Sequence, residues 1–194
     1  MRWLAVVLAL GGCDGVFGLR HVGEPSDASG SASSDGRPLV RPDGDPGNCP
    51  ASYSFTLPTT ASRYRVVLEG KDWLSAEAAC AADMPGSTHL IVLSVPGEWD
   101  ALGAQSEIFL TNFVWVGLSD RKTEGTFIPV THEDTNGYPA AMKTPWAPGL
   151  PTNGGADCAQ MEPVTGLLHD ISCTDSQNYI CECDRHADDP TLFP

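Results

Sequence analysis

The chain has 194 residues and a formal net charge of −14, with 25 acidic and 11 basic side chains. This length suits one folded domain with extensions. The excess of acid argues against a nucleic-acid partner, because phosphate binding requires clusters of Lys and Arg. The acidic excess fits a well-solvated surface. It also leaves calcium open as a candidate ion, although the sequence predicts no firm cofactor.

The first twelve residues are typical of an export signal. Arg2 precedes an apolar run over residues 3–10, which is much shorter than the roughly 20 residues that span a bilayer. The run Leu10-Gly11-Gly12-Cys13 resembles a bacterial lipobox, which implies cleavage before Cys13 and a lipid on that cysteine. We therefore expect a signal peptide over residues 1–12 and an exported, membrane-anchored lipoprotein. An ordinary signal with a leftover thiol, and hence a secreted protein, is the alternative.

Three further segments follow from composition. Residues 13–47 hold the lipid site and then a stretch rich in Ser, Gly, Asp and Pro, which cannot bury apolar surface and predicts a disordered linker. Residues 48–184 are predicted to fold as one domain. Residues 185–194 are expected to form a frayed tail.

The first half of the domain predicts a strand and a helix. Residues 64–68 are β-branched and aromatic, and Glu69-Gly70 should close that strand. Asp72 is expected to cap a helix over residues 73–82. Trp73, Ala76 and Cys80 would share one face of this helix, so that Cys80 points into the core.

A second strand is predicted over residues 89–93, and a second helix should begin near Ser94-Val95-Pro96 with an apolar stripe. The run 113–118 is the most apolar and should be the central strand. Further strands are expected over the segments 124–130, 158–161, 166–168 and 178–181. The region 131–156 lacks periodicity and is punctuated by Gly and Pro, and loops of this length are often functional.

The chain contains seven cysteines: Cys13, Cys49, Cys80, Cys158, Cys173, Cys181 and Cys183. None forms a C-x-x-C pair, so their spacing does not indicate a zinc site. Six of them fall in the predicted domain after an apolar leader. This pattern favours three disulfides formed in an oxidising compartment, with Cys13 left for the lipid.

Several motifs occur in an order that resembles the C-type lectin-like domain. Trp115-Val116-Gly117-Leu118 is similar to the family's W-I-G-L motif, and Tyr179-Ile180-Cys181-Glu182 is similar to its F-I-C-E ending. The others are Cys80, Trp146 before a Gly-x-Pro-x-Asn turn, Asp157-Cys158 and His169-Asp170-x-x-Cys173. The resemblance implies an α+β fold with two helices flanking small antiparallel sheets and a long loop region that holds the ligand. It also implies disulfides Cys80–Cys181, Cys158–Cys173 and Cys49–Cys183.

The resemblance also identifies positions for a calcium site, and most of them are altered. Calcium takes 6–8 oxygen ligands. The family supplies them from a Glu-Pro-Asn turn, from an acidic residue two before the cysteine at 158, and from a Trp-Asn-Asp run. Here these positions hold Leu150, Thr152, Ala156 and His169, so only Asp170 keeps a ligating side chain.

Other arrangements around the loop stay open. Asp157 with Glu133, Asp134 and Asn136 could form a different cation site, although the run over residues 133–137 is also typical of an ordinary acidic turn. His169 with Asp170 could ligate zinc or form a structural hydrogen-bonded pair. Trp146 could line a binding surface or belong to the core. The candidate ligand-binding residues are therefore Trp146, Asn153, Asp157, His169 and Asp170, with Asp170 and Asp157 as weak metal candidates.

Three function classes compete. The first is a non-catalytic recognition module that binds a glycan or a protein through the loop. The second is a structural or protein-interaction lipoprotein that binds no sugar. The third, an enzyme, is disfavoured because no G-x-S-x-G, H-E-x-x-H or P-loop motif occurs and the five histidines are scattered along the chain.

Overall fold

The computed structural model describes residues 48–58, 60–94, 98, 101–102, 112–133, 146–152 and 154–194. The chain divides into two compact units, Met1–Val40 and Arg41–Pro194, and every described residue lies in the second. The predicted signal, Cys13 and the predicted linker lie outside the described residues, as does most of the segment predicted to form a second helix. No helix in the described part of the chain is long and apolar enough to cross a bilayer.

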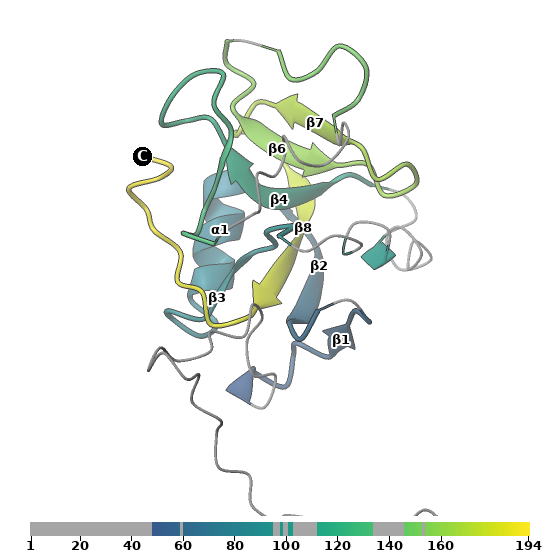
Figure 1. The fold of residues 1–194 in the computed structure, drawn as a ribbon, viewed down its shortest axis with the longest axis vertical. Coiled ribbons are helices and arrows are strands. Elements are labelled where there is room, and N and C mark those ends of the chain that lie inside the picture. The colour runs from purple at the N-terminus through teal and green to yellow at the C-terminus, as the bar shows by residue number, and fades with distance from the viewer. Residues whose placement is uncertain are drawn as a thin grey trace, which may run out of the picture. The chain divides into compact units, whose positions relative to one another are not determined.

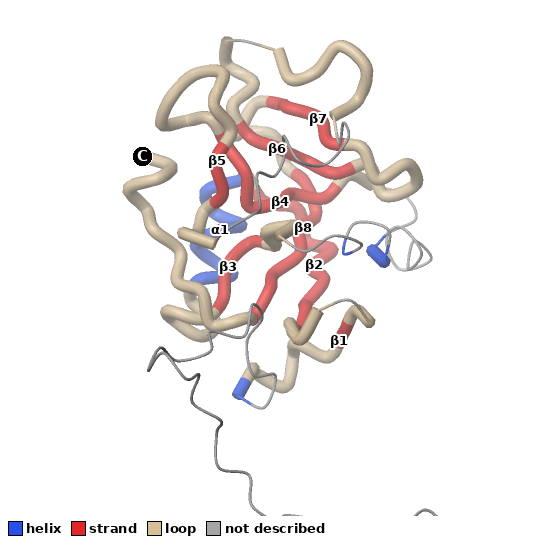
Figure 2. The backbone as a smooth tube through the Cα atoms, viewed as in Figure 1, coloured by secondary structure: helices blue, strands red, loops and turns tan. Residues whose placement is uncertain are grey.

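The described residues form one helix and one mixed sheet (Figures 1 and 2). The elements are β1 (Phe55–Thr56), β2 (Arg63–Lys71), α1 (Trp73–Ala81), β3 (Thr88–Leu90), β4 (Val114–Ser119), β5 (Ile128–Pro129), β6 (Cys158–Met161), β7 (Leu168–Ile171) and β8 (Gln177–Cys183). The sheet has eight strands in the order β1-β2-β8-β4-β6-β7, with β3 also paired to β8 and β5 to β4. Its pairs are antiparallel except β4 and β8, whose parallel pairing joins the two halves. The α+β class is therefore confirmed, with one continuous sheet in place of separate antiparallel sheets.

Helix α1 begins where its cap predicts. Asp72 Oδ1 accepts a hydrogen bond from the backbone N–H of Ser75 at 2.9 Å, which satisfies one of the free amides of the first turn. Trp73, Ala76 and Cys80 are buried together, as expected from their spacing. The indole N–H of Trp73 donates to the carbonyl of Val116 at 2.9 Å and so fixes the helix against β4.

Strands β2 and β3 depart from their predicted lengths. A bulge carries β2 past Glu69-Gly70 to Lys71, so this pair does not end the strand. Strand β3 ends at Leu90, although the apolar run continues to residue 93. Beyond it the backbone N–H of Ile91 donates to the carbonyl of Ile180 at 2.9 Å, that of Val92 donates to the side-chain carboxylate of Glu182 at 3.0 Å, and the segment stays buried.

Strand β4 is the predicted central strand, and all six of its residues are buried. It lies between β8 and β6. Gly117 permits a close approach here, because a Cβ atom at this position would lie 2.6 Å from the carbonyl oxygen of Leu90. The later strands shift slightly: β5 is only two residues long, and β7 starts at Leu168, where the predicted strand ends.

Three disulfides link Cys49–Cys183, Cys80–Cys181 and Cys158–Cys173, the pairs that the resemblance implies. The first two end on β8. The third joins β6 to the segment after β7. The sheet, the helix and the chain's entry into the domain are thus joined covalently at one strand.

The tail is packed, so its prediction as a frayed terminus is wrong. The N–H of Asp189 donates to the carbonyl of Val130 at 2.8 Å, and Arg121 donates to the carbonyl of Pro194 at 2.6 Å. Phe193 is only 7% exposed, with its ring centroid 5.4 Å from that of Trp73 in an edge-on contact. The tail stays folded because Phe193 covers an aromatic surface of the helix.

Helix α1 carries a buried carboxyl group at Glu77. One oxygen accepts the N–H of Leu90 at 2.8 Å, and the other is buried without a hydrogen-bond partner. Burial raises the pKa of Glu77 to about 7, against the opposing effects of the nearby His89 charge and the Leu90 hydrogen bond.

The raised pKa predicts a loss of stability with rising pH. Between the unfolded value of about 4.5 and the folded value of about 7, only the folded state holds the proton, so the free energy of unfolding falls as pH rises. We expect Glu77→Gln to remove this fall. At about pH 8 the variant should exceed the parent by on the order of 2–3 kcal/mol, and near pH 4 the two should agree, measured by urea unfolding. The exposed Glu69→Gln is the control, and an equal difference at both pH values would contradict the prediction.

Candidate functional site

The region predicted to be a long loop is described on either side of residues 134–145, up to Glu133 after β5 and again from Trp146. Trp146 forms an isolated bridge with Leu168, and its ring lies edge-on to that of Phe127 at 4.7 Å between centroids. The side chain is half-buried against the core. Trp146 therefore closes the base of the loop, with part of its surface still available to a ligand.

The turn after Trp146 is held from two sides by carboxylates. The Leu150–Pro151 peptide is cis, and both the N–H and the hydroxyl of Thr152 donate to Asp170 Oδ2 at 2.6 Å. On the other side the N–H of Gly154 donates to Glu124 at 2.6 Å. Asn153, a predicted ligand residue, lies outside the described residues. The turn is an exposed surface fixed by charge-assisted hydrogen bonds.

His169 and Asp170 contact different groups in the structure. They are consecutive residues of β7, so their side chains leave opposite faces of the strand. His169 Nε2 lies 3.7 Å from a Glu162 carboxylate oxygen, and its ring meets the edge of Phe113 at 5.1 Å. Asp170 instead contacts Thr152. The structure gives the two side chains different partners, and their suggested roles as a zinc pair or a hydrogen-bonded pair stay predictions.

The positions of the family's calcium ligands can be compared with this geometry. Leu150 offers no side-chain oxygen, and the Thr152 hydroxyl is used as a donor to Asp170. Oδ2 of Asp170 is taken by those two bonds, while Oδ1 is buried without a hydrogen-bond partner. One free carboxylate oxygen is far fewer than the 6–8 ligands that calcium takes.

A group of acidic residues at the base of the turn was missed by the sequence reasoning, which singled out only Asp157. The carbonyl of Asp157 accepts the N–H of Asp120 at 3.1 Å, and Asp120 Oδ2 accepts the N–H of Gly125 at 2.8 Å. Burial first, and then the charges of Glu124 and Asp157, raise the pKa of Asp120 against that hydrogen bond. The sequence pattern that could have revealed this group is the pair Asp120 and Glu124, four residues apart directly after the predicted apolar strand.

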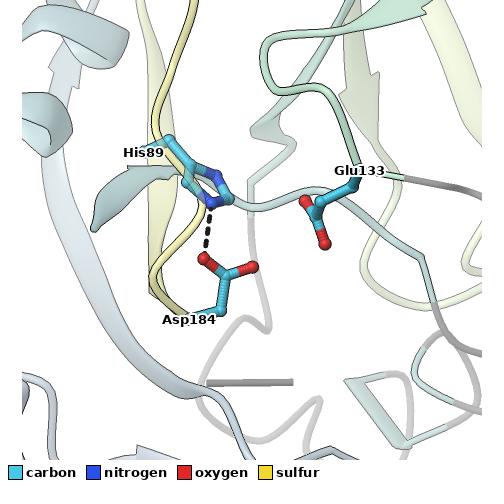
Figure 3. Close-up of side chains that lie close together, drawn as sticks. All are labelled: His89, Glu133 and Asp184. Atoms are coloured by element: carbon cyan, nitrogen blue, oxygen red, sulfur yellow. Dashed lines mark hydrogen bonds and ion pairs between the residues drawn. The ribbon is translucent and has the colours of Figure 1, made fainter. Parts of the chain in front are cut away.

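The alternative cation site of Asp157 with Glu133, Asp134 and Asn136 stays a prediction, but Glu133 has other partners in the structure. Glu133 Oε1 lies 3.0 Å from His186 Nδ1, in a separate buried cluster with Asp184 and His89 (Figure 3). Asp134 and Asn136 lie outside the described residues. The described part of the loop region thus combines a half-buried tryptophan, an exposed polar turn and carboxylates from three elements.

Comparison with known proteins identifies the family. The family model of the lectin C-type domain matches residues 69–183, which is more than half of the chain. A C-type lectin mannose-binding isoform of Oxyuranus scutellatus is 27% identical over 141 residues, covering 70% of this chain and 83% of the relative. The hepatic lectin of Gallus gallus is 30% identical over 124 residues, 61% of this chain and 53% of the relative.

Solved structures give the same result. The carbohydrate-recognition domain of the mouse scavenger receptor C-type lectin has a TM-score of 0.55 and 26% identity, covering 72% of this chain and 98% of that one. A calcium-independent type II antifreeze protein has a TM-score of 0.54 and 24% identity, covering 70% and 94%, and shows the fold alone. The family match, the relatives and the fold agree, so the chain belongs to the C-type lectin domain family.

Proposed function

We propose that this domain is a non-catalytic recognition module that binds a glycan or a protein at the surface formed by Trp146, Thr152, Asp157 and Asp170, without calcium coordinated to the ligand. The observation that carries the proposal is the pair of 2.6 Å hydrogen bonds from Thr152 to Asp170 Oδ2. They occupy Oδ2 of the one carboxylate that this chain keeps from the calcium ligands implied by the family resemblance. The chain's own turn therefore takes the place of the ion.

The chemistry of the turn favours a ligand rich in hydroxyl or cationic groups. Glu124, Asp157 and Asp170 are acceptors, and the turn between them is exposed and small. Carboxylates accept short, strong hydrogen bonds from such donors. The half-buried ring of Trp146 adds an apolar face on which a sugar ring can stack. The names of the relatives, which include a mannose-binding isoform and a carbohydrate-recognition domain, support a glycan as the first class to test.

The second candidate is a structural or protein-interaction role without sugar binding. It is favoured by the same Thr152–Asp170 contact, because a turn whose polar groups are satisfied internally has fewer of them left for a sugar. In either case we propose that the domain is exported and held at a membrane by a lipid on Cys13, as the lipobox-like leader suggests.

The first prediction from this proposal concerns ligand binding. On a glycan array the full chain should bind a restricted set of glycans equally well with calcium and with EGTA, because no calcium bridges protein and sugar. Asp170→Asn keeps the side chain's shape but removes its charge, and it should weaken binding at least tenfold. Binding that disappears with EGTA and is restored by calcium but not by zinc would contradict the proposal, and an absence of binding to any glycan would favour the second candidate.

A second prediction restores the missing ligands. The double variant Leu150→Glu/Thr152→Asn should gain calcium-dependent stability, because it returns two oxygen ligands beside Asp170. With calcium at about 100 times its Kd, the free energy of unfolding should rise by about 2.7 kcal/mol. The parent serves as the control, measured in the same thermal melts. If the parent shows the same rise, calcium binds at the parent's own residues and the substituted positions do not explain its behaviour.

A third prediction tests the anchor. Cys13→Ser should move the protein from the membrane fraction to the soluble exported fraction of an expressing bacterial cell, because a serine cannot accept the thioether lipid. Cys49→Ser is the matched control, since it removes a different sulfur and leaves the leader unchanged. Equal membrane association of Cys13→Ser and parent would contradict lipidation at Cys13.

A further inference from the structure

A second polar cluster lies away from the proposed ligand turn. His89, Glu133 and Asp184 each offer one ligand atom, and these three atoms lie within 4.8 Å of one another. The residues come from three segments: β3, the chain after β5, and the end of β8 (Figure 3). All three side chains are inaccessible, with exposed fractions of 0% for His89 and 3% for both Glu133 and Asp184.

A fourth side chain adjoins this cluster. His186 Nδ1 lies 3.0 Å from Glu133 Oε1 and 3.5 Å from Asp184 Oδ2. Its side chain is 32% exposed, so it connects the buried carboxylates to solvent. One imidazole and two carboxylates from distant parts of the sequence therefore lie together, and a second imidazole contacts both carboxylates from the solvent side.

We propose that His89, Glu133, Asp184 and His186 form a binding site for a divalent transition-metal ion of the zinc class. The ligand atoms would be Nε2 of His89, Nδ1 of His186 and one oxygen from each carboxylate. Imidazole nitrogen suits zinc and its neighbours in the transition series, whereas calcium and magnesium select oxygen. The cluster offers too few oxygens for calcium and the usual nitrogen–oxygen set for zinc.

The distances fit four-coordinate zinc. Zinc binds nitrogen and carboxylate oxygen at about 2.0–2.1 Å, so two ligand atoms in a tetrahedron lie about 3.3 Å apart. His89 Nε2 lies 3.0 Å from Asp184 Oδ1, and His186 Nδ1 lies 3.0 and 3.5 Å from the two carboxylates. These three separations are close to that spacing, but Asp184 faces His89 with Oδ1 and His186 with Oδ2, so binding through one Asp184 oxygen requires a small movement of His186 toward the other three ligands.

Each buried ligand is also oriented by a second group. His89 Nδ1 lies 2.7 Å from the carbonyl of Leu90, which can only accept, so the Nδ1 proton points there and Nε2 faces the carboxylates. The hydroxyl of Thr131 donates to the Glu133 carboxylate at 2.9 Å, and the backbone N–H of His186 donates to Asp184 Oδ1 at 2.8 Å. Metal-binding imidazoles and carboxylates are typically held in this way.

Charge supplies an independent argument. Two carboxylates that are only a few per cent exposed require positive charge beside them, because burying an unpaired ion is costly. One divalent ion supplies both charges at the point where the oxygens meet, with both imidazoles neutral. The competing arrangement has no metal and two protonated imidazoles, and the experiment below separates the two.

The experiment titrates Zn²⁺ into the full chain, expressed without a histidine tag, with its disulfides formed and with metal removed by a chelator. Isothermal titration calorimetry should show one zinc ion per chain, and thermal melts should show a higher Tm with zinc, because the ion binds the folded state. An excess of calcium should not displace it. An absence of zinc binding at micromolar protein concentration would overturn the proposal, and the four side chains would then be an ion-pair network without a metal.

Variants assign the site. Glu133→Gln keeps the shape of the side chain and should weaken zinc binding at least tenfold, as should the half-exposed His186→Ala. His132→Ala is the matched control, because His132 adjoins Glu133 in sequence but is 72% exposed and contacts Asp189. Melts of the metal-free variants test whether each still folds. Zinc affinity unchanged in both site variants, or reduced equally in the control, would overturn the assignment.

Discussion

Strand β8 is the constraint on which the rest of the domain depends. β2, β3 and β4 all pair with it, and the disulfides from Cys49 and Cys80 end on it. Figure 1 shows it running between the end of the sheet with β6 and β7 and the end with β1. Because the cross-links span most of the domain's length, the unfolded chain loses much of its freedom when they form. Removing β8 would separate the helix, both halves of the sheet and the N-terminal edge.

Buried carboxylates complete this frame. Glu77 accepts the backbone N–H of Leu90, the last residue of β3, and Glu182 accepts that of Val92, two residues further on. An unpaired buried amide costs as much as a lost hydrogen bond, so the acids replace a missing strand. This arrangement carries its own cost, since burial raises the pKa of Glu182 well above its usual range. Part of the chain's acidity is therefore structural, and only the remainder acts as a solvating surface.

Local sequence signals predicted the parts of the fold that depend on local chemistry. The cap at Asp72, the buried face of α1 and the central position of β4 follow from hydrogen bonding and apolar patterning, and they were found. The hydrogen bond from Val92 to Glu182, just beyond β3, joins residues 90 apart and could not be recognised from the local sequence. The packed tail depended in the same way on where Trp73 lies after folding.

The site was predictable to a smaller extent. The resemblance identified the positions of the loop ligands, and their replacements at Leu150 and Thr152 could be read directly. The bond between Thr152 and Asp170 could not, because it joins residues 18 apart that only the turn brings together. The same holds for the histidines, whose spacing in the sequence suggested no shared site. His89 and His186 approach the same carboxylates because His89 pairs with β8 through β3 and His186 follows the end of β8.

The loop and the buried cluster meet through one short segment. Val130 pairs with Gly117 on one side and with Asp189 on the other, Thr131 bridges to Asp188, and Glu133 then enters the cluster. The far end of the loop is held separately, by Trp146 on Phe127. A cation at Glu133 would therefore fix one end of the loop, while a ligand at Thr152 and Asp170 acts beyond the other. A reagent that removes every divalent ion would act on the Glu133 end of this region, so loss of ligand binding on chelation would not by itself place a metal in the ligand site.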